Sequence, residues 1–289
     1  MSLAVQTLDP ILFEVIIVNN NSTDNTLDIA NKFISEFSNF RLVNEEKQGL
    51  SNARNRGITE SEGDYIAYLD DDAKASPFWL EKALNIFLGM IPEPLAIGGV
   101  ILPFYEYDKP KWFKDSYESR TWGSKTRYLN KGESFSGSNM IFKKKSLEQY
   151  KGFSTKYGIT GENLMLGDET SLFLHMYEVE NRDGIFFYSP SLVVYHLVPG
   201  YKTRPQYFMK RNFVAGKTSA NIYRNQGLRH YIRIPYFIAL FFVGLIVAPF
   251  TFFWTWNWSS WLAERIAPKF YYLGYLTQCV GLNINVKNK

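Results

Sequence analysis

Acidic side chains gather where an apolar segment of the sequence gives way to a polar turn. Asp70, Asp71 and Asp72 directly follow the apolar residues YIAYL, and a segment typical of a helix comes next. Carboxylates one residue apart at a strand end offer hard oxygen ligands to Mg²⁺ or Mn²⁺, and a cation would relieve their mutual repulsion. The alternative is that acidic residues before a helix stabilise its positive N-terminus. The triplet alone does not decide between these interpretations.

A second acidic pair, Asp168 and Glu169, stands before TSLFLHMYEV, a segment typical of a helix. Neighbouring carboxyl groups can raise the pKa of one of them. A structural role for the same pair is capping of the helix. His196 ends the strand-like segment SLVVYHLV, and a structural role is one interpretation of a lone histidine at a strand end.

The segments that would position these side chains alternate between strand and helix patterns. This alternation predicts an α/β fold with a mainly parallel sheet flanked by helices, whose ligands collect at the carboxyl ends of the strands. The polar loops NNNSTD, LDDDA and GDE should then converge on one edge. The first expected strands are FEVIIV, FRLVNE and DYIAYLD, and the first expected helices contain residues 27–37, GLSNARNRGITES and WLEKALNIFL.

Composition limits the class of protein further. A chain of 289 residues can form one large α/β domain or two smaller ones. The net charge of +4 is mild and, taken alone, argues neither for nor against a nucleic-acid partner; we expect none. The single cysteine, Cys279, excludes an internal disulfide and a cysteine-based zinc site, which suits a reducing compartment. No basic segment followed by an apolar core is visible at the N-terminus, so we expect no secretory signal.

The C-terminal part has a different character. Residues 234–263 carry no formal charge, exceed the ~20 residues that cross a bilayer, and have tryptophans gathered at one end. Arginines just upstream favour a cytoplasmic location for the preceding domain. We predict a globular domain over residues 1–222 and a hydrophobic, membrane-associated helical region over residues 223–289, peripheral or C-terminally anchored at the cytoplasmic face. A buried helical hairpin packed on the globular domain is the alternative.

Five motifs occur in one order: EVIIVNNNSTDNT, GLSNARNRGI, GDYIAYLDDDA, SGSNMIFKK and GDETSL. Over about residues 12–220 the chain resembles family 2 glycosyltransferases, which are inverting enzymes of the GT-A fold. The resemblance implies transfer of a sugar from a nucleotide-sugar, with a UDP-sugar as the expected donor, to a saccharide or lipid-linked saccharide. It also implies a Mg²⁺ or Mn²⁺ cofactor and a role in cell-surface polysaccharide or glycolipid synthesis.

On the donor side, the resemblance places Asn19 and Asn20 where relatives carry acidic residues beside the nucleobase, and asparagine can still form hydrogen bonds with a base. Arg54 and Asn55 fall where the family has polar residues that face the donor. Arg54 could neutralise the diphosphate, or it could be a surface arginine of the helix. Asp71 is expected to face the sugar or the ribose.

Around the metal, the resemblance matches Asp70 and Asp72 to the two ends of the family's DxD motif, with Asp72 as the favoured direct ligand. His196 lies where some relatives have a histidine that meets the metal or the diphosphate. Gly137 and Asn139 match a Gly-x-Asn turn beside the donor sugar and the acceptor. A simple turn that leads into a strand is the alternative for these two residues.

The family's general base lies in a Glu-Asp pair at a helix start, and this chain has the reverse order, Asp168-Glu169. Aligned on the family pattern, Glu169 takes the position of the base, and Asp168 is its neighbour or an acceptor-binding carboxylate. The implied mechanism is a direct displacement in which Glu169 takes the proton of the acceptor hydroxyl, with inversion at the anomeric carbon.

The family normally opens with one more strand, which ends in a Thr-Tyr-Asn-like turn of the nucleotide pocket. Here SLAVQTLDPILFEV resembles the tail of the first helix, so we expect the sheet to lack an interior strand. A non-catalytic, membrane-associated relative is therefore the alternative function. A nucleotidyltransferase is a third hypothesis, but it predicts a glycine-rich, lysine-bearing phosphate loop near the N-terminus, and the sequence has none there.

Overall fold

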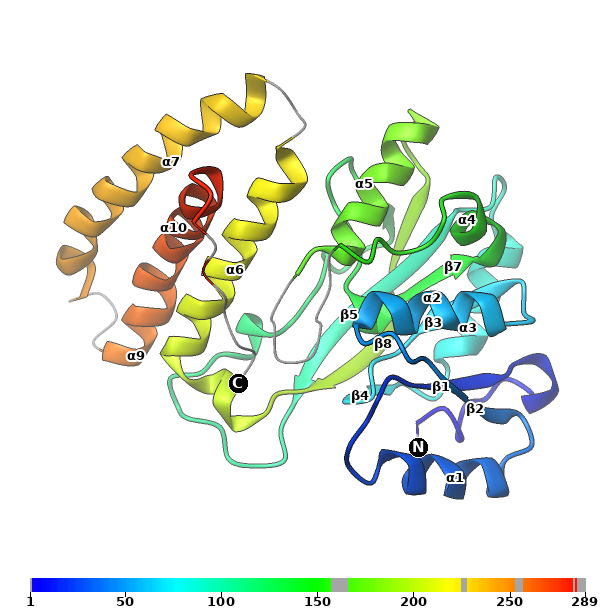
Figure 1. The fold of residues 1–289 in the computed structure, drawn as a ribbon. Coiled ribbons are helices and arrows are strands. Elements are labelled where there is room, and N and C mark those ends of the chain that lie inside the picture. Colours follow the sequence, from blue (N-terminus) through cyan, green and yellow to red (C-terminus); the bar gives the residue numbers. More distant parts are fainter. Residues whose placement is uncertain (1, 157–165, 225–227, 253–256, 283, 285–289) are drawn as a thin grey trace. The chain divides into compact units, whose positions relative to one another are not determined.

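The structure is a computed structural model that describes residues 2–156, 166–224, 228–252, 257–282 and 284. The chain divides into two compact units (Figure 1). Unit 1 comprises Met1–Phe104, Glu118–Lys156 and Asp168–Leu197, and unit 2 comprises Tyr105–Tyr117, Tyr157–Gly167 and Val198–Lys289. The domain boundary expected after residue 222 stays a prediction, although helix α6 (Pro205–Tyr223) already belongs to unit 2.

Unit 1 contains two sheets. Strands β1 (Val15–Asn19) and β2 (Phe40–Asn44) form a parallel pair and are joined by α1 (Thr26–Glu36). The larger sheet has the order β3-β7-β5-β8-β4, and β6 also pairs with β8. Its strands are β3 (Tyr65–Tyr68), β4 (Ala73–Ala75), β5 (Ala96–Phe104), β6 (Arg127–Tyr128), β7 (Met140–Lys143) and β8 (Phe186–Leu197). The remaining helices are α2 (Leu50–Glu60), α3 (Trp79–Gly89), α4 (Lys144–Gln149) and α5 (Asp168–Glu180).

The α/β fold with helices that flank a sheet is confirmed, but the expectation of a mainly parallel sheet is wrong for the larger sheet. There β5 and β8 pair in parallel, whereas the β3–β7, β5–β7, β4–β8 and β6–β8 pairs are antiparallel. Parallel pairing needs a long crossover, usually a helix. The regular alternation of strand and helix stops after β5, where a long irregular segment leads to β7.

Two strand edges in unit 1 are open. The N–H of Val15 donates to Asn39 O, so the odd-numbered residues of β1 face β2, and Ile16 and Val18 face the other edge. The N–H of Lys144 donates to Asp64 O, so the even-numbered residues of β3 bond to β7. No described strand pairs with either open edge. Within the described residues, β1 and β2 thus form a sheet that is separate from the larger one.

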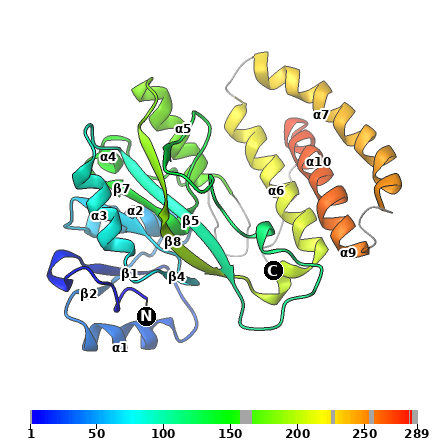
Figure 2. The ribbon, with the colours of Figure 1, turned by 180° about the vertical axis from the view of Figure 1, so that it is seen from behind.

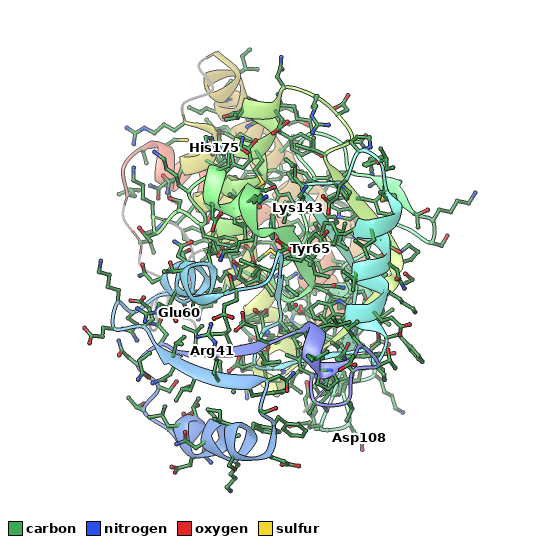
Figure 3. The ribbon with its side chains drawn as sticks, turned by 90° about the vertical axis from the view of Figure 1, so that its right-hand side faces the viewer. Arg41, Glu60, Tyr65, Asp108, Lys143 and His175 are labelled. Carbon is green, nitrogen blue, oxygen red and sulfur yellow. The ribbon has the colours of Figure 1, made fainter. Side chains whose placement is uncertain are left out.

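Charged side chains connect the small sheet to α2. Nε of Arg41 lies 2.9 Å from Glu14 Oε2, and its Nη1 lies 3.2 Å from Glu60 Oε2. Figure 3 shows Arg41 of β2 beside Glu60 at the end of α2. These partly exposed ion pairs attach the small sheet, and each of them stabilises by about 0–1 kcal/mol.

In the larger sheet, Tyr65 and Lys143 lie opposite each other in register.

The core of unit 1 lies on both faces of the larger sheet, because successive strand residues point to opposite sides. On β7, Phe142 packs with Phe173 of α5, whereas Ile141 packs with Trp79 and Phe87 of α3. Figures 1 and 2 show α5 and α3 on opposite faces of this sheet. Full burial of each large apolar side chain stabilises the fold by roughly 1.5–3 kcal/mol.

Unit 2 is helical. Helix α6 packs closely on α10 (Ala267–Cys279), because a Cβ atom on Gly216 would lie 2.0 Å from Tyr271 O and one on Gly274 would lie 1.9 Å from Phe213 O. These glycines let the two backbones touch. Unit 2 also contains α7 (Leu228–Val247), the 3₁₀ turn η5 (Ala248–Thr251), α9 (Trp258–Trp261) and the π-helical turn η6 (Leu262–Ile266).

The apolar stretch 234–263 forms more than one element. Helix α7 ends at Val247, just before Pro249, whose ring cannot continue a helix. The indole N–H of Trp261 donates to Ala248 O at 2.9 Å, so α9 packs back on η5. By length and composition, the helical segment Ile232–Thr251 could cross a membrane. Its mean hydropathy is 2.1, and only 6% of its most apolar stretch is buried. The alternative of a buried hairpin does not describe α7, whose side chains are mostly exposed.

Candidate active site

The strand pairing of unit 1 brings Asp70, Asp72 and His196 together. Strand β4 runs antiparallel to β8 with Ala73 opposite His196, so the aspartates before β4 lie beside the end of β8. Nε2 of His196 is 3.2 Å from Asp72 Oδ1 and 3.6 Å from Asp70 Oδ2. The three candidate ligand atoms lie within 4.8 Å of one another. The N–H of Leu197 fixes the turn by donating to Asp72 O at 2.9 Å.

The imidazole of His196 is oriented as a ligand should be. Its Nδ1 lies 3.0 Å from the carbonyl oxygen of Leu197. With the proton assigned to Nδ1, this atom donates to the carbonyl, and the lone pair of Nε2 faces Asp70 and Asp72. A hydrogen bond of this kind commonly fixes the tautomer of a metal-bound histidine. The donor set of two carboxylates and one imidazole suits a divalent cation such as Mn²⁺ or Mg²⁺. The three residues predicted as metal ligands are thus brought together.

Arg54 joins this cluster to the second acidic pair. Its guanidinium forms an ion pair with Asp168, lies 3.2 Å from Glu169 Oε1, and reaches to 3.7 Å from Asp70 Oδ1. Its carbon Cζ stands 5.3 Å from the ring centre of Phe153. Burial alone would lower the pKa of Arg54, but the surrounding carboxylates outweigh burial and raise it. Arg54 is 6% exposed, so the surface alternative for this residue is wrong.

The two carboxyl groups at the start of α5 have different environments. The side chain of Asp168 is 4% exposed and paired with Arg54, whereas that of Glu169 is 22% exposed. Burial raises the pKa of Glu169 to about 7, the Arg54 charge opposes this shift, and the neighbouring Asp168 adds to it. Glu169 therefore combines access to a ligand with a high proton affinity. These two properties are required of a general base at neutral pH.

Gly137 belongs to this site because of the space that its missing side chain leaves. It lies in the 3₁₀ turn η3 (Gly137–Asn139). A Cβ atom at this position would lie 1.9 Å from Arg54 Nη2 and 2.6 Å from Glu169 Oε1. The guanidinium and the carboxylate thus pack directly on its backbone, which no other residue would allow.

We expect Gly137→Ala to displace Arg54 and Glu169 and to destabilise the fold by about 1–3 kcal/mol, the usual cost of overpacking. Chemical denaturation measures the change. Gly57→Ala is the matched control, because a Cβ atom there has no neighbour within 4 Å and alanine favours a helix interior. Equal stability of the two variants would contradict this account of Gly137.

The structure gives Asn139 a different place from the predicted one. Its side chain is fully buried, Oδ1 accepts from the indole N–H of Trp79 at 2.9 Å, and Nδ2 donates to the carbonyl oxygens of Val100 and Leu192, each at 2.9 Å. The amide thus joins β5, β8 and α3 inside the core. The predicted contact with an acceptor is not supported, because burial removes the amide from any open surface.

The asparagines predicted to face the donor also hold the backbone. Asn55 donates to Phe153 O and accepts from Phe153 N–H, both at 2.8 Å, and so fixes the ring that lies against Arg54. Asn20 accepts from Gly49 N–H at 2.6 Å and donates to two carbonyl oxygens of the loop after β2. Asn19 donates to Asn44 Oδ1 at 2.9 Å. Their amides are occupied by the protein, while the predicted donor contacts stay predictions.

Asp71 and Phe153 show the limits of the motif pattern. Asp71 is exposed and lies outside the cluster of candidate ligands, and its predicted contact with sugar or ribose stays a prediction.

Phe153 was not expected in the site, although its ring contacts the Arg54 guanidinium. An aromatic residue in YKGFS carries no local pattern that points to a site, because its role depends on the distant Arg54.

These features define an α/β protein with a candidate divalent-cation site connected through a buried arginine to a general-base candidate. Residues 2–151, more than half of the chain, match the family model described as glycosyl transferase family 2. The chain therefore belongs to glycosyltransferase family 2.

Curated relatives agree with this family. A glucosyl-dolichyl phosphate glucuronosyltransferase of Haloferax volcanii is 26% identical over 222 residues, which cover 74% of this chain and 68% of the relative. The glycosyltransferase AglE of the same organism is 38% identical over 85 residues, covering 29% of this chain and 28% of AglE. The shorter match thus spans under a third of either protein.

Solved structures share the fold at low sequence identity. GalNAc-T7 with UDP, GalNAc and Mn²⁺ has a TM-score of 0.51 and 14% identity, covering 68% of this chain and 40% of that one. Staphylococcus aureus TarS 1-349 in complex with UDP-GlcNAc has a TM-score of 0.50 and 14% identity, covering 97% of this chain and 86% of that one.

Proposed function

We propose that this glycosyltransferase is an inverting, metal-dependent enzyme that moves a sugar from a UDP-sugar to a hydroxyl group of a saccharide or lipid-linked saccharide. One observation carries the proposal: Arg54 connects the Asp70–Asp72–His196 cluster with Glu169, the carboxyl group of high pKa. A cation-binding group and a proton acceptor are the two chemical functions that a single displacement needs.

The residues of this chain would act as follows. Glu169 takes the proton of the acceptor hydroxyl, whose oxygen attacks the anomeric carbon. The bond from that carbon to the diphosphate oxygen breaks, and the electron pair leaves with the nucleoside diphosphate. One displacement inverts the configuration. A divalent cation held by Asp70, Asp72 and His196 would stabilise charge on the diphosphate.

Arg54 acts as a positioning residue in this proposal. Its charge is shared among Asp70, Asp168 and Glu169, so it is not free to neutralise a diphosphate. The carboxylate pair would repel without it. Arg54 thus permits two carboxyl groups to stand next to the donor site while Glu169 keeps its proton affinity.

The identities of donor and acceptor rest on the relatives. TarS was solved with UDP-GlcNAc and GalNAc-T7 with UDP, which supports a uridine nucleotide. One relative is named for a glucosyl-dolichyl phosphate acceptor, which supports a lipid-linked acceptor and a role in glycan synthesis. We place Asn19 near the nucleobase and Asp71 near the sugar or ribose, where the family pattern puts them.

We also propose that unit 2 associates with the cytoplasmic face of a membrane through α7. This helix exposes large apolar side chains along its length, among them Tyr236, Phe242 and Ile246. Arg224 precedes α7 and Arg233 lies in its N-terminal half, which supports a cytoplasmic orientation.

Metal binding is the direct test of the site. We expect Asp72→Asn and His196→Ala each to weaken Mn²⁺ binding in the presence of UDP by more than the roughly 10–100-fold that loss of an outer partner costs. Titration calorimetry measures the affinity, and Asp28→Asn, at an exposed position of α1, is the control of equal charge change. Unchanged Mn²⁺ affinity in both ligand variants would remove the metal site from the proposal.

Turnover separates the enzyme from a non-catalytic relative. Purified protein with Mn²⁺ is expected to transfer or hydrolyse the sugar of at least one UDP-sugar, and a chelator should stop this reaction. Binding of UDP with Mn²⁺ but without turnover of any donor would favour the non-catalytic alternative.

A further inference from the structure

A cleft in unit 2 places two cations beside the apolar helix α7. It has a volume of about 220 Å³, and its walls include Leu240, Val243 and Val247 of α7. The opposite wall carries Arg265 at the end of η6 and Lys269 in the first turn of α10. Arg265 is exposed, so the cleft opens to the surface.

Gly244 makes room for one of these cations. A Cβ atom on Gly244 would lie 2.2 Å from Lys269 Cε and 2.6 Å from Lys269 Nζ. The ammonium group therefore packs on the bare backbone of α7. A glycine inside a helix costs about 0.5–1 kcal/mol relative to alanine. A glycine at this position therefore does not help α7 to form, but it leaves the space that the Lys269 ammonium group occupies.

In the described part of the chain, the positive charge in the cleft is balanced only in part, through the longer-range attraction between Arg265 and Glu264. Among the described residues, neither Arg265 nor Lys269 has an ion-pair partner within 4.0 Å. The neighbouring acid, Glu264, accepts from Lys114 Nζ at 2.6 Å and from the hydroxyl of Tyr117 at 2.5 Å, so it is already engaged. Like charges four residues apart on a helix repel. An anion from outside the chain would relieve this repulsion.

The surroundings of the cleft fit a lipid. Phe242, Ile246, Phe250 and Trp258 are 59%, 68%, 76% and 60% exposed. An interfacial helix places apolar side chains among acyl chains while cations reach toward headgroups. A tryptophan suits the same depth, because its ring has an apolar body and a polar N–H group.

We propose that Arg265 and Lys269 bind the phosphate of an anionic phospholipid headgroup while α7 lies in the membrane interface. This inference rests on the membrane association proposed above and adds the class of lipid. Charge complementarity carries it, since two cations line the cleft without an ion pair within 4.0 Å among the described residues, and the lining contains no acidic residue.

Vesicle sedimentation with the full chain tests the inference. We expect binding to vesicles of phosphatidylcholine through α7, and tighter binding when phosphatidylglycerol is added. Each basic residue near an anionic surface contributes about five-fold in affinity, so Arg265→Gln with Lys269→Gln should reduce binding to the mixed vesicles roughly thirty-fold. Binding to phosphatidylcholine alone should not change. High salt screens charge and should therefore also remove the additional affinity for vesicles that contain phosphatidylglycerol.

Two controls distinguish a defined cleft from general attraction. Lys32→Gln with Lys145→Gln removes the same charge from exposed positions of unit 1 and should have a much smaller effect. Gly244→Ala keeps every charge but displaces the Lys269 ammonium, and it should lose part of the preference for phosphatidylglycerol. Full preference in Gly244→Ala would overturn the defined cleft.

The remaining outcomes are also decisive. Equal binding to neutral and anionic vesicles would overturn the headgroup site but keep the membrane association of α7. Absence of binding to any vesicle would overturn both, without bearing on sugar transfer. Binding of inorganic phosphate without vesicles, abolished in Arg265→Gln with Lys269→Gln, would assign the cleft to free phosphate instead.

Discussion

Replacing Glu169 with glutamine is expected to slow sugar transfer by about 10²–10⁴-fold, the usual contribution of a positioned general base. Glutamine has nearly the same shape, so it preserves packing against Gly137 but cannot take a proton. The affinity for UDP and Mn²⁺ should change little, because Glu169 lies outside the candidate metal cluster. Transfer rates at saturating donor, compared with calorimetric UDP binding, separate the two effects.

Asp168→Asn is the matched control for this prediction. Its carboxylate is 4% exposed and paired with Arg54, so its removal should lower the stability of unit 1. The folded fraction of this variant should keep more activity than Glu169→Gln. The opposite order, with turnover retained in Glu169→Gln and lost in Asp168→Asn, would assign the base to Asp168.

The pH profile gives an independent signature of the base. Because the pKa of Glu169 is raised to about 7, its ionised fraction rises as the pH increases through about 7, and the transfer rate should rise with it. The free energy of unfolding should change with pH in the opposite direction to the transfer rate. Between the ordinary glutamate pKa of 4.5 and about 7, the folded chain keeps a proton that the unfolded chain releases, so stability falls as the pH rises through this window. Glu169→Gln should abolish both effects.

The cluster of Asp70, Asp72 and His196 could be predicted from the sequence because each residue belongs to a local pattern. Aspartates at the end of an apolar strand and a histidine at the end of another are visible in one dimension, and the order of motifs identified the family. The same patterns placed most of the early strands and helices. Local patterning therefore predicts which chemical groups a site contains.

The sequence could not predict how those groups are held. Asn139 was expected in a Gly-x-Asn turn near the acceptor, yet its amide forms hydrogen bonds with three elements. The whole core determines how these elements pack together. Arg54 was expected to face the donor or to be a surface arginine of the helix, yet three acidic side chains from β3–β4 and α5 surround it. The antiparallel direction of β7 depends on the course of a long irregular segment, which has no periodicity to read. Tertiary packing decides all three.

Arg54→Met is expected to destabilise the fold by about 3–5 kcal/mol, because removal of one partner leaves buried charges without compensation. Methionine keeps much of the length and apolar volume of the side chain, so the loss reflects charge more than packing. Arg56→Met, two residues further along α2, is the control. Arg56 is 40% exposed and paired with Glu60 at 2.7 Å, so its loss should cost about 0–1 kcal/mol. Urea denaturation at neutral pH measures both values.

Acidic pH should rescue Arg54→Met. The Arg54 charge lowers the pKa of Glu169, so its loss raises this pKa further, and protonation removes the uncompensated charge. The stability difference from the unaltered chain should therefore shrink as the pH falls, whereas a pure packing defect would be independent of pH. Arg54→Lys distinguishes charge from geometry. If it restores stability but not transfer, the planar guanidinium is needed to orient Glu169, because an ammonium group balances the charge without fixing two carboxylates in place.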